Sequence, residues 1–268
     1  MNKPEVYLKH IDIVEGDTKN ILKKYFHLIR QSTNKSKAAL DIGCGPGNVT
    51  QGVLFPFLEK DIDEVIGVDI DAKMIEYANK TYGNNQFKFR VADLGEIVPD
   101  DFVGRFDYIF SFWALQWIQD QSKLYSNIMK MLKPNGDMFV IYIARSKLYD
   151  IYQAVWNKPK YAQYIPNFNT AQSPFQKSKK PVEELLQILK KAGLQDLFCE
   201  TVTVRLPYTR KGVESFLLSL SPHYDRIPKE LQNDFLMDHV NLVDTTSEDS
   251  DYGYYIDYEL FITHARKI

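Results

Sequence analysis

Residues 38–47 have the sequence AALDIGCGPG, an apolar run that ends in an acid and continues with glycine at every second position. A short apolar run followed by such a loop indicates a buried strand that enters a tight turn. Glycine lets the backbone bend sharply and lets a ligand approach where a Cβ atom would collide. Because open α/β sheets bind their ligands at the carboxyl ends of strands, we expect this loop to bind a cofactor.

The spacing of the glycines favours one class of cofactor. A dinucleotide fingerprint has the pattern G-x-G-x-x-G and holds a pyrophosphate at a helix N-terminus. Here the pattern is G-x-G-x-G, with Asp41 two residues before Gly43 and with Cys44 and Gly45 inside the loop. A carboxylate at this point would repel a pyrophosphate, whereas S-adenosylmethionine (SAM) carries an ammonium and a sulfonium and no phosphate. We therefore expect SAM, against the alternative of an ordinary glycine-rich turn.

A second apolar strand is expected at residues 65–69 and ends at Asp69. This acid lies a little beyond the ~20 residues that separate a glycine loop from its ribose-binding acid, so it is placed to accept hydrogen bonds from both ribose hydroxyls. Asp71 is the expected N-cap of a helix over 72–80, and Gly83 is the expected end of that helix.

A third strand over 87–91 alternates apolar and polar residues, and Asp93 follows it closely. Three acids that each follow a strand, in this order after a G-x-G-x-G loop, resemble the class I SAM-dependent methyltransferases. In that family the third acid lies near the adenine amino group, so the resemblance gives this position to Asp93. The resemblance implies SAM as cofactor, S-adenosyl-L-homocysteine as product, and a cofactor site formed by Asp41, Gly43, Cys44, Gly45, Asp69, Ile70, Met74, Asp93, Leu94 and Ser111.

Composition limits the kinds of partner that we expect the protein to bind and the compartment in which we expect it. The 268 residues carry a formal net charge of −2 with a sequence pI near 6.2, whereas a general nucleic-acid binder should be basic, so we expect no nucleic-acid partner. Two cysteines, Cys44 and Cys199, without metal-ligand spacing predict neither a disulfide nor a metal site. The N-terminus is polar and no apolar run approaches the ~20 residues of a membrane span, so we expect a cytoplasmic protein. The sequence leaves a homodimer open.

The rest of the chain continues the alternation of strands and helices. An amphipathic helix is expected over 17–30, a helix bent at Pro56 should follow the glycine loop, and 133–136 should form a turn. This alternation predicts an α/β, Rossmann-like class I methyltransferase fold, with a mostly parallel seven-stranded sheet, helices on both faces and a helical and aromatic cap. The other expected elements are strands over 106–112, 137–143, 197–206 and 254–265, the last antiparallel, and helices over 121–132, 181–191, 211–220 and 228–243.

Aromatic residues concentrate between residues 144 and 180, where prolines interrupt the regular pattern. A disordered linker would lack aromatics, so we expect a cap over an apolar pocket, with ordinary core packing as the alternative. The chain is then one methyltransferase domain over 1–268, in which 1–31 form an N-terminal lid segment and helix. Within that domain, 144–180 and 207–251 form substrate-cap insertions.

The segment after the strand at 106–112 contains Trp113, Gln116 and Trp117 and no histidine. Alcohol, phenol and amine acceptors usually benefit from a general base, whereas a carboxylate with a pKa of about 4 is already ionised at pH 7. Indole and amide N–H groups are hydrogen-bond donors and suit a carboxylate. For such an acceptor the protein need only orient the oxygen and exclude water.

Residues 92–94, 110–121 and 173–175, with the aromatic cap, resemble the insect juvenile hormone acid O-methyltransferase family over nearly the whole chain. Its members methylate the carboxylate of farnesoic acid or juvenile hormone acids with SAM. A tryptophan that matches Trp117 and an N-terminal glutamine hold that carboxylate, but the glutamine position is Val14 here, and Gln116 is the expected substitute. The resemblance implies that Trp117 holds the carboxylate. We expect catalytic roles for Trp117 and Gln116, and an acceptor site formed by Val14, Trp113, Trp117, Tyr149, Tyr152 and Trp156.

The expected function is therefore methyl-ester formation on a small apolar carboxylic acid, either juvenile hormone acid or farnesoic acid. Two alternatives stay open. One is a methyltransferase of the same fold that acts on another small apolar acceptor, such as a fatty acid or an amine. The other is a protein that binds SAM or a terpenoid with weak or no turnover, because Val14 has no donor.

Overall fold

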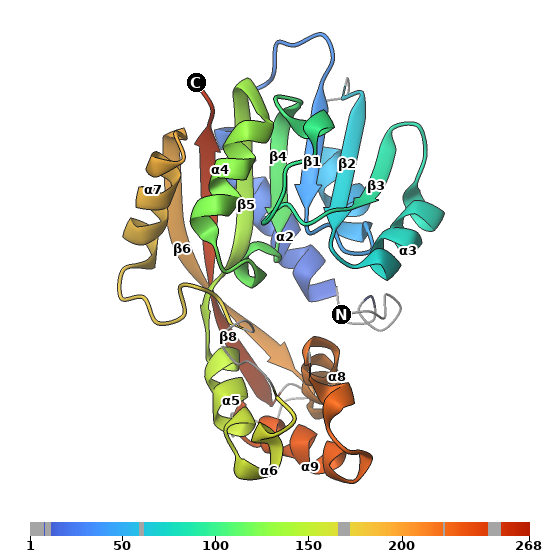
Figure 1. Cartoon of the computed structure of the whole chain (residues 1–268). Helices are drawn as coiled ribbons and strands as arrows, with labels where there is room; N and C mark the ends of the chain where they lie inside the picture. Colours follow the sequence, from blue (N-terminus) through green and yellow to red (C-terminus); the bar gives the residue numbers. More distant parts are fainter. Residues whose placement is uncertain (1–7, 9–11, 59–61, 166–171, 222, 246–252) are drawn as a thin grey trace.

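The computed structural model describes residues 8, 12–58, 62–165, 172–221, 223–245 and 253–268. Their centre is one twisted sheet with the strand order β3-β2-β1-β4-β5-β8-β6, and β7 pairs with β8 (Figure 1). Strands β1 to β5 pair in parallel, and β8 is antiparallel to its neighbours β5 and β6. The strands are β1 Ala38–Ile42, β2 Glu64–Asp69, β3 Phe87–Val91, β4 Phe106–Phe112, β5 Leu132–Ser146, β6 Gln195–Tyr208, β7 Asp244–Thr245 and β8 Tyr254–Arg266.

The predicted α/β fold and the antiparallel last strand are confirmed. Within the described residues, seven strands have at least five residues. The eighth, β7, has two residues and is too short to produce a pattern in the sequence. The strand order reverses at the neighbours β1 and β4, because β2 and β3 continue to one side and β5 to the other. Ligands of open α/β sheets bind at such a switch point, beyond the carboxyl ends of the strands.

Helices cover both faces of the sheet. On one face α2 and α3 pack with Leu22 and Ile75 in their core, and on the other α4 and α7 pack with Leu124 and Leu185 (Figure 1). Asp71 caps α3 as predicted, because its side chain accepts hydrogen bonds from the backbone N–H groups of the first turn. The α-helices are α2 Asp12–Tyr25, α3 Ala72–Tyr82, α4 Gln121–Met131, α5 Lys147–Trp156, α6 Pro159–Ala162, α7 Pro181–Lys191, α8 Arg210–Leu220 and α9 Lys229–Val240.

Three local expectations differ from the structure. The helix expected over 17–30 begins at Asp12 and ends at Tyr25. The helix after the glycine loop is a π-helix, Val49–Leu54, followed by a 3-10 turn, Phe55–Phe57. Proline has no N–H to continue an α-helical ladder, so Pro56 at the start of this turn tightens the chain instead of bending one α-helix.

Strand β5 is about twice as long as the 137–143 expected. Its second half continues past β4 and pairs with β8 as far as Ser146. At its start the pairing with β4 shifts register, so the expected turn at 133–136 is a bulge within the strand, with Asn135 at φ 64°. The β5–β8 pairings join residues more than a hundred positions apart, which local periodicity cannot show.

A second lobe forms around the far ends of β5, β6 and β8 (Figure 1). Helices α5, α6, α8 and α9 surround these ends and contain most of the aromatic residues expected in the cap. The large side chains among them are buried, including Tyr149, Tyr152, Trp156 and Tyr161. Parts of the predicted lid and cap segments, at 1–7, 9–11, 166–171 and 246–252, lie outside the described residues. No helix within the described ranges is both long and apolar enough to cross a membrane.

Candidate active site

The glycine loop lies at the carboxyl end of β1 and is tied to β2. The N–H groups of Gly43 and Cys44 both donate to the carbonyl of Val68, at 2.8 and 2.9 Å. A Cβ on Gly43 would lie 2.1 Å from the Cβ of Ala114, so this glycine allows the close approach of the chain that follows β4. Gly45 has φ 54°, and a Cβ added to it would meet no atom within 4 Å, so this glycine borders open space beside the strand ends.

Asp69 is held in place by the glycine loop. Its Oδ2 accepts from the backbone N–H of Gly45 at 3.0 Å, and its Oδ1 accepts from that of Asp71 at 2.9 Å. Each carboxylate oxygen keeps a further lone pair for a ligand hydroxyl. Burial raises the pKa of Asp69, and the backbone hydrogen bonds oppose that rise. Ile70 beside it is 71% exposed, and an apolar surface at this point suits one face of an adenine.

Asp41 is buried at the end of β1, with 1% of its surface exposed. Its Oδ2 accepts from the hydroxyl of Thr50 at 2.6 Å, and its Oδ1 has no hydrogen-bond partner among the described residues. Burial raises the pKa of Asp41 to about 7, the Thr50 hydrogen bond lowers it, and the charge of Asp69 raises it further. A buried acceptor without a partner requires an explanation, and the ammonium of SAM supplies one. These residues therefore fit the cofactor.

The other predicted cofactor residues differ in their exposure and in their hydrogen bonds. Asp93 is exposed in the turn after β3, where its Oδ1 accepts from the N–H of Gly95 at 3.1 Å. Met74 and Leu94 are buried, and the buried Ser111 donates from its hydroxyl to the carbonyl of Ile42 at 2.7 Å. The Ser111 hydroxyl thus joins β4 to β1. A direct contact of these side chains with SAM stays a prediction.

The segment after β4 turns sharply at Trp113, which has φ 58°. A left-handed conformation is uncommon for a bulky residue and tends to occur at functional sites. The turn is braced by Gln116, whose Nε2 donates to the Trp113 carbonyl at 2.6 Å and whose Oε1 accepts from the N–H of Ile143 at 3.4 Å. The indole N–H of Trp113 donates to Thr18 of α2 at 3.1 Å. Gln116 therefore supports the loop, and its contact with an acceptor stays a prediction.

Trp117 lies four residues further and differs from Trp113. Its indole N–H is buried and has no hydrogen-bond partner in the part of the chain that the structure describes. Its ring meets the ring of Tyr149 edge to face, with the centroids 6.5 Å apart. The hydroxyls of Tyr149 and Tyr152 on α5 are likewise buried without a described partner. The structure thus brings together one tryptophan after β4 and two tyrosines of the second lobe.

Three further residues, Asp17, Tyr208 and Tyr258, were not identified as candidate site residues from the sequence. Asp17 of α2 has a buried Oδ2 without a described partner, and burial raises its pKa. It lies near the hydroxyl of Tyr208, which in turn neighbours Tyr258, and the ring of Tyr258 meets Trp113 at 6.1 Å. The only sequence signal is helical spacing, because Asp17 follows Val14 by three residues and shares its face of α2. Half-buried Val14 packs against the same core.

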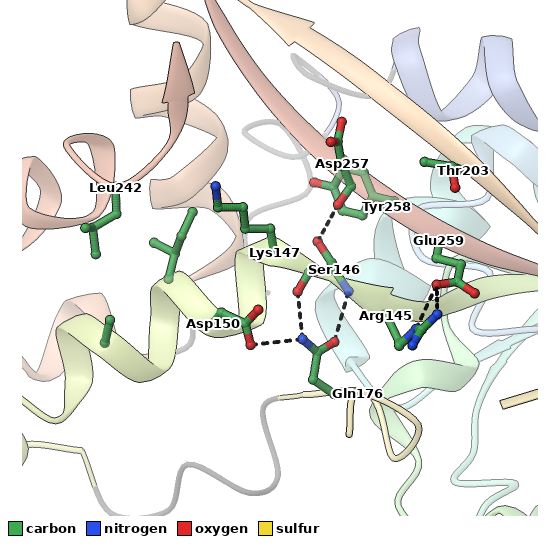
Figure 2. Close-up of a pocket in the computed structure, with 12 residues that line it drawn as sticks. Arg145, Ser146, Lys147, Asp150, Gln176, Thr203, Leu242, Asp257, Tyr258 and Glu259 are labelled. Carbon is green, nitrogen blue, oxygen red and sulfur yellow. Dashed lines mark hydrogen bonds and ion pairs between the residues drawn. The ribbon is translucent and has the colours of Figure 1, made fainter. Parts of the chain in front are cut away.

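A separate cavity of about 620 Å³ opens where β5 leads into α5 (Figure 2). Charged side chains line it, and Figure 2 shows Arg145 paired with Glu259 and Gln176 bonded to Ser146 and Asp150. This lining shares no residue with the predicted cofactor or acceptor sites. Most of its lining residues nevertheless belong to the predicted cap segments 144–180 and 207–251, and Tyr258 in the lining also meets Trp113. The acceptor pocket expected from the cap stays a prediction.

Comparisons with known proteins identify the family to which the chain belongs. A family model described as a methyltransferase domain matches residues 33–193, more than half of the sequence. The chain belongs to the methyltransferase domain family. With the class I fold and the SAM-type loop, it is a SAM-dependent methyltransferase that transfers a methyl group to an acceptor.

The methyltransferase has relatives of similar length. The juvenile hormone acid O-methyltransferase of Drosophila melanogaster is 28% identical, over 100% of this chain and 93% of the relative. That of Bombyx mori is 27% identical, over 91% of this chain and 86% of the relative. Among solved structures, the YcgJ protein of Bacillus subtilis has a TM-score of 0.59 and 15% identity, with coverage of 92% and 98%, and this likeness concerns the fold alone.

Proposed function

We propose that this methyltransferase forms the methyl ester of a sesquiterpenoid carboxylic acid, juvenile hormone acid or farnesoic acid. The observation that carries the proposal is the buried indole N–H of Trp117, a donor without a described partner beside the cofactor loop. The two insect relatives support the acceptor class through their names. A cytoplasmic location, a homodimer and the lack of a nucleic-acid partner stay predictions.

The chain's own residues supply binding and orientation. Asp41, Gly45 and Asp69 would hold SAM, which supplies an electrophilic methyl group on its sulfonium. Trp117 would orient the ionised carboxylate, whose oxygen bonds to the methyl carbon as the carbon–sulfur bond breaks and S-adenosyl-L-homocysteine leaves. The carboxylate needs no base at pH 7, so the rate depends on alignment and on the exclusion of water. The buried aromatic rings of α5 would cover the reacting groups.

The proposal is tested by methyl transfer from SAM to farnesoic acid, with lauric acid as a comparison acceptor. The Trp117→Phe variant keeps most of the ring packing and removes the N–H. Loss of one donor to a charged group costs about 1.5–3 kcal/mol, or roughly ten- to a hundred-fold in kcat/KM. The comparison variant is Trp113→Phe, which removes an N–H that already has a partner in Thr18; its kcat/KM on farnesoic acid should fall less than that of Trp117→Phe.

The reverse change is Val14→Gln, which restores the donor of the insect family on the buried face of α2. We expect it to raise turnover of farnesoic acid. If Trp117→Phe equals the parent and Val14→Gln gains nothing, neither residue reaches the carboxylate. SAM binding without any product from sesquiterpenoid acids would favour a binding protein without turnover.

A second candidate function is methyl transfer to an amine, and Asp17 favours it. Asp17 is half-buried, its buried Oδ2 has no described partner and it lies near Tyr208, so its carboxylate would attract an ammonium group. Its raised pKa would also suit a group that accepts a proton from the amine. Comparison of dodecylamine with lauric acid as acceptors separates the two functions. Activity on the amine that Asp17→Asn abolishes, without activity on the acid, would replace the first proposal.

A further inference from the structure

We propose that the hydroxyls of Tyr149 and Tyr152, together with the indole N–H of Trp117, form a cradle of neutral donors that binds the anionic oxygens of the acceptor. The inference rests on the proposed function and names the residues that replace the donor missing at Val14. The three groups come from two lobes, since Trp117 follows β4 and both tyrosines belong to α5.

The three donors lie on neighbouring segments, two on α5 and one on the segment after β4. Tyr149 and Tyr152 are three residues apart on α5 and therefore point to the same side of the helix. The ring of Tyr149 meets Trp117 at 6.5 Å, and the ring of Tyr152 stacks on Trp156 at 5.0 Å, which fixes both orientations. All three polar atoms are buried, and none has a hydrogen-bond partner among the described residues.

Several other buried tyrosine hydroxyls have partners, whereas that of Tyr258 on β8 has none among the described residues. The hydroxyl of Tyr161 donates to Asp238 at 2.8 Å, and that of Tyr125 donates to Tyr142 at 3.1 Å. Buried polar groups normally have partners, and an unpaired one lowers stability. Two unpaired hydroxyls on one helical face beside an unpaired N–H therefore indicate a site that a ligand completes.

The electrostatic properties of these donors suit a carboxylate nucleophile. Burial raises the pKa of both Tyr149 and Tyr152 far above the ordinary value, so both hydroxyls stay protonated and able to donate. Neutral donors stabilise an anion without pairing it with a full positive charge, which would weaken its attack on a methyl group. Tyr208 and Tyr258 lie near Tyr152, and Asp17 lies near Tyr208.

The test uses Tyr149→Phe, Tyr152→Phe and the double variant, because phenylalanine keeps the ring and removes only the hydroxyl. Calorimetry on the full chain loaded with S-adenosyl-L-homocysteine compares farnesoic acid with farnesol, its neutral alcohol. We expect each single variant to bind the acid roughly tenfold more weakly and the double variant roughly a hundredfold. Binding of farnesol should change little.

A second readout is thermal stability without ligand. Removal of an unpaired buried hydroxyl should raise the melting temperature of the Tyr149 and Tyr152 variants while their affinity for the acid falls. The control Tyr161→Phe loses a hydrogen bond to Asp238, so its melting temperature should fall while its affinity for the acid stays that of the parent. A merely structural role would lower stability and leave the preference for acid over alcohol unchanged.

The outcomes separate this inference from the function on which it rests. If the parent methylates farnesoic acid and the double variant binds that acid as tightly as the parent, the cradle is wrong and the function stands. If the parent neither binds nor methylates any lipid carboxylate, the proposed function fails. Equal losses for acid and alcohol in the double variant would also overturn the cradle, because they would indicate lost packing.

Discussion

Asp69 illustrates how one side chain serves both the fold and the ligand. Its two oxygens already accept from backbone N–H groups, which fix its position before any cofactor arrives. The Asp69→Ala variant should lose both ribose hydrogen bonds, each worth about 1.5–3 kcal/mol to a charged group. We expect the affinity for SAM, measured by calorimetry, to fall by roughly a hundredfold or more.

The control for this change is Asp101→Ala. Asp101 is an exposed acid that pairs with Arg90 at 2.6 Å on the surface, away from the glycine loop. This variant should bind SAM like the parent. Unchanged affinity in Asp69→Ala would exclude the ribose role.

Asp41 links cofactor binding to pH. Its folded-state pKa of about 7 lies above the ordinary value of 3.8, because burial disfavours the charged carboxylate. Below pH 7 the group must therefore lose a proton before it pairs with the ammonium of SAM. We expect the association constant for SAM, measured by calorimetry, to rise roughly tenfold between pH 6 and pH 7.5.

The Asp41→Asn variant cannot ionise, so its weaker binding should be flat over the same range. The same group lowers the stability of the ligand-free protein as pH rises. The folded state still holds a proton that the unfolded chain has released once pH exceeds about 4. A parent affinity that does not depend on pH would show that the ammonium binds elsewhere.

At the scale of elements, the packing of α5 against α9 depends on a neutral histidine. The Nδ1 of His239 lies 2.7 Å from the carbonyl of Phe235, and its Nε2 lies 3.1 Å from the indole nitrogen of Trp156. The indole can only donate, so Nε2 accepts and Nδ1 carries the proton. Burial lowers the pKa of His239 to about 4, because the charged form is disfavoured there.

A lowered pKa makes the second lobe sensitive to acid. The unfolded chain binds a proton near pH 6.5, whereas folded His239 does so only near pH 4. The stabilisation is therefore present above pH 6.5 and is lost between these values, by about 3 kcal/mol in all. We expect the free energy of unfolding, measured by denaturant titration at several pH values, to fall over this window.

A glutamine at position 239 accepts a hydrogen bond but does not titrate, so His239→Gln should flatten this part of the pH curve. The same replacement at the exposed His27 should leave the curve like that of the parent. If both variants follow the parent, other groups carry the acid sensitivity of the lobe.

Strand β1 and the loop after it show what local sequence can predict. Residues 38–47 define β1 and its loop, because apolar runs, glycine spacing and an N-cap at Asp71 are local signals. The partners of Trp117 were not predictable in this way. Its contact with Tyr149 depends on the face of α5 that meets the loop after β4, and contacts between distant segments leave no periodic trace.

At the scale of the whole molecule, three long strands connect the two lobes. Strands β5 and β6 start in the main sheet and end among α5, α8 and α9, whereas β8 starts among these helices and ends in the main sheet (Figure 1). The sequence predicted the positions of these strands but gave β5 about half its length, because the part of β5 beyond β4 is held by its pairing with β8. Strand β6 extends two residues past the expected 197–206 at each end. The aromatic core of the second lobe thereby continues to the carboxyl end of β4, where the cofactor loop and Trp117 lie.

This continuity predicts how affinity depends on the length of the acceptor. An acid held at Trp117 extends its apolar chain toward the buried aromatic core of the second lobe, which includes Trp156 of α5. Each buried CH₂ group contributes about 0.8 kcal/mol, or close to a fourfold change in affinity. Calorimetry with octanoic, decanoic and dodecanoic acids should therefore show dissociation constants that fall by roughly fifteenfold at each step of two carbons. Equal affinities across the series would mean that the acceptor chain stays in solvent and that the aromatic lobe has only a structural role.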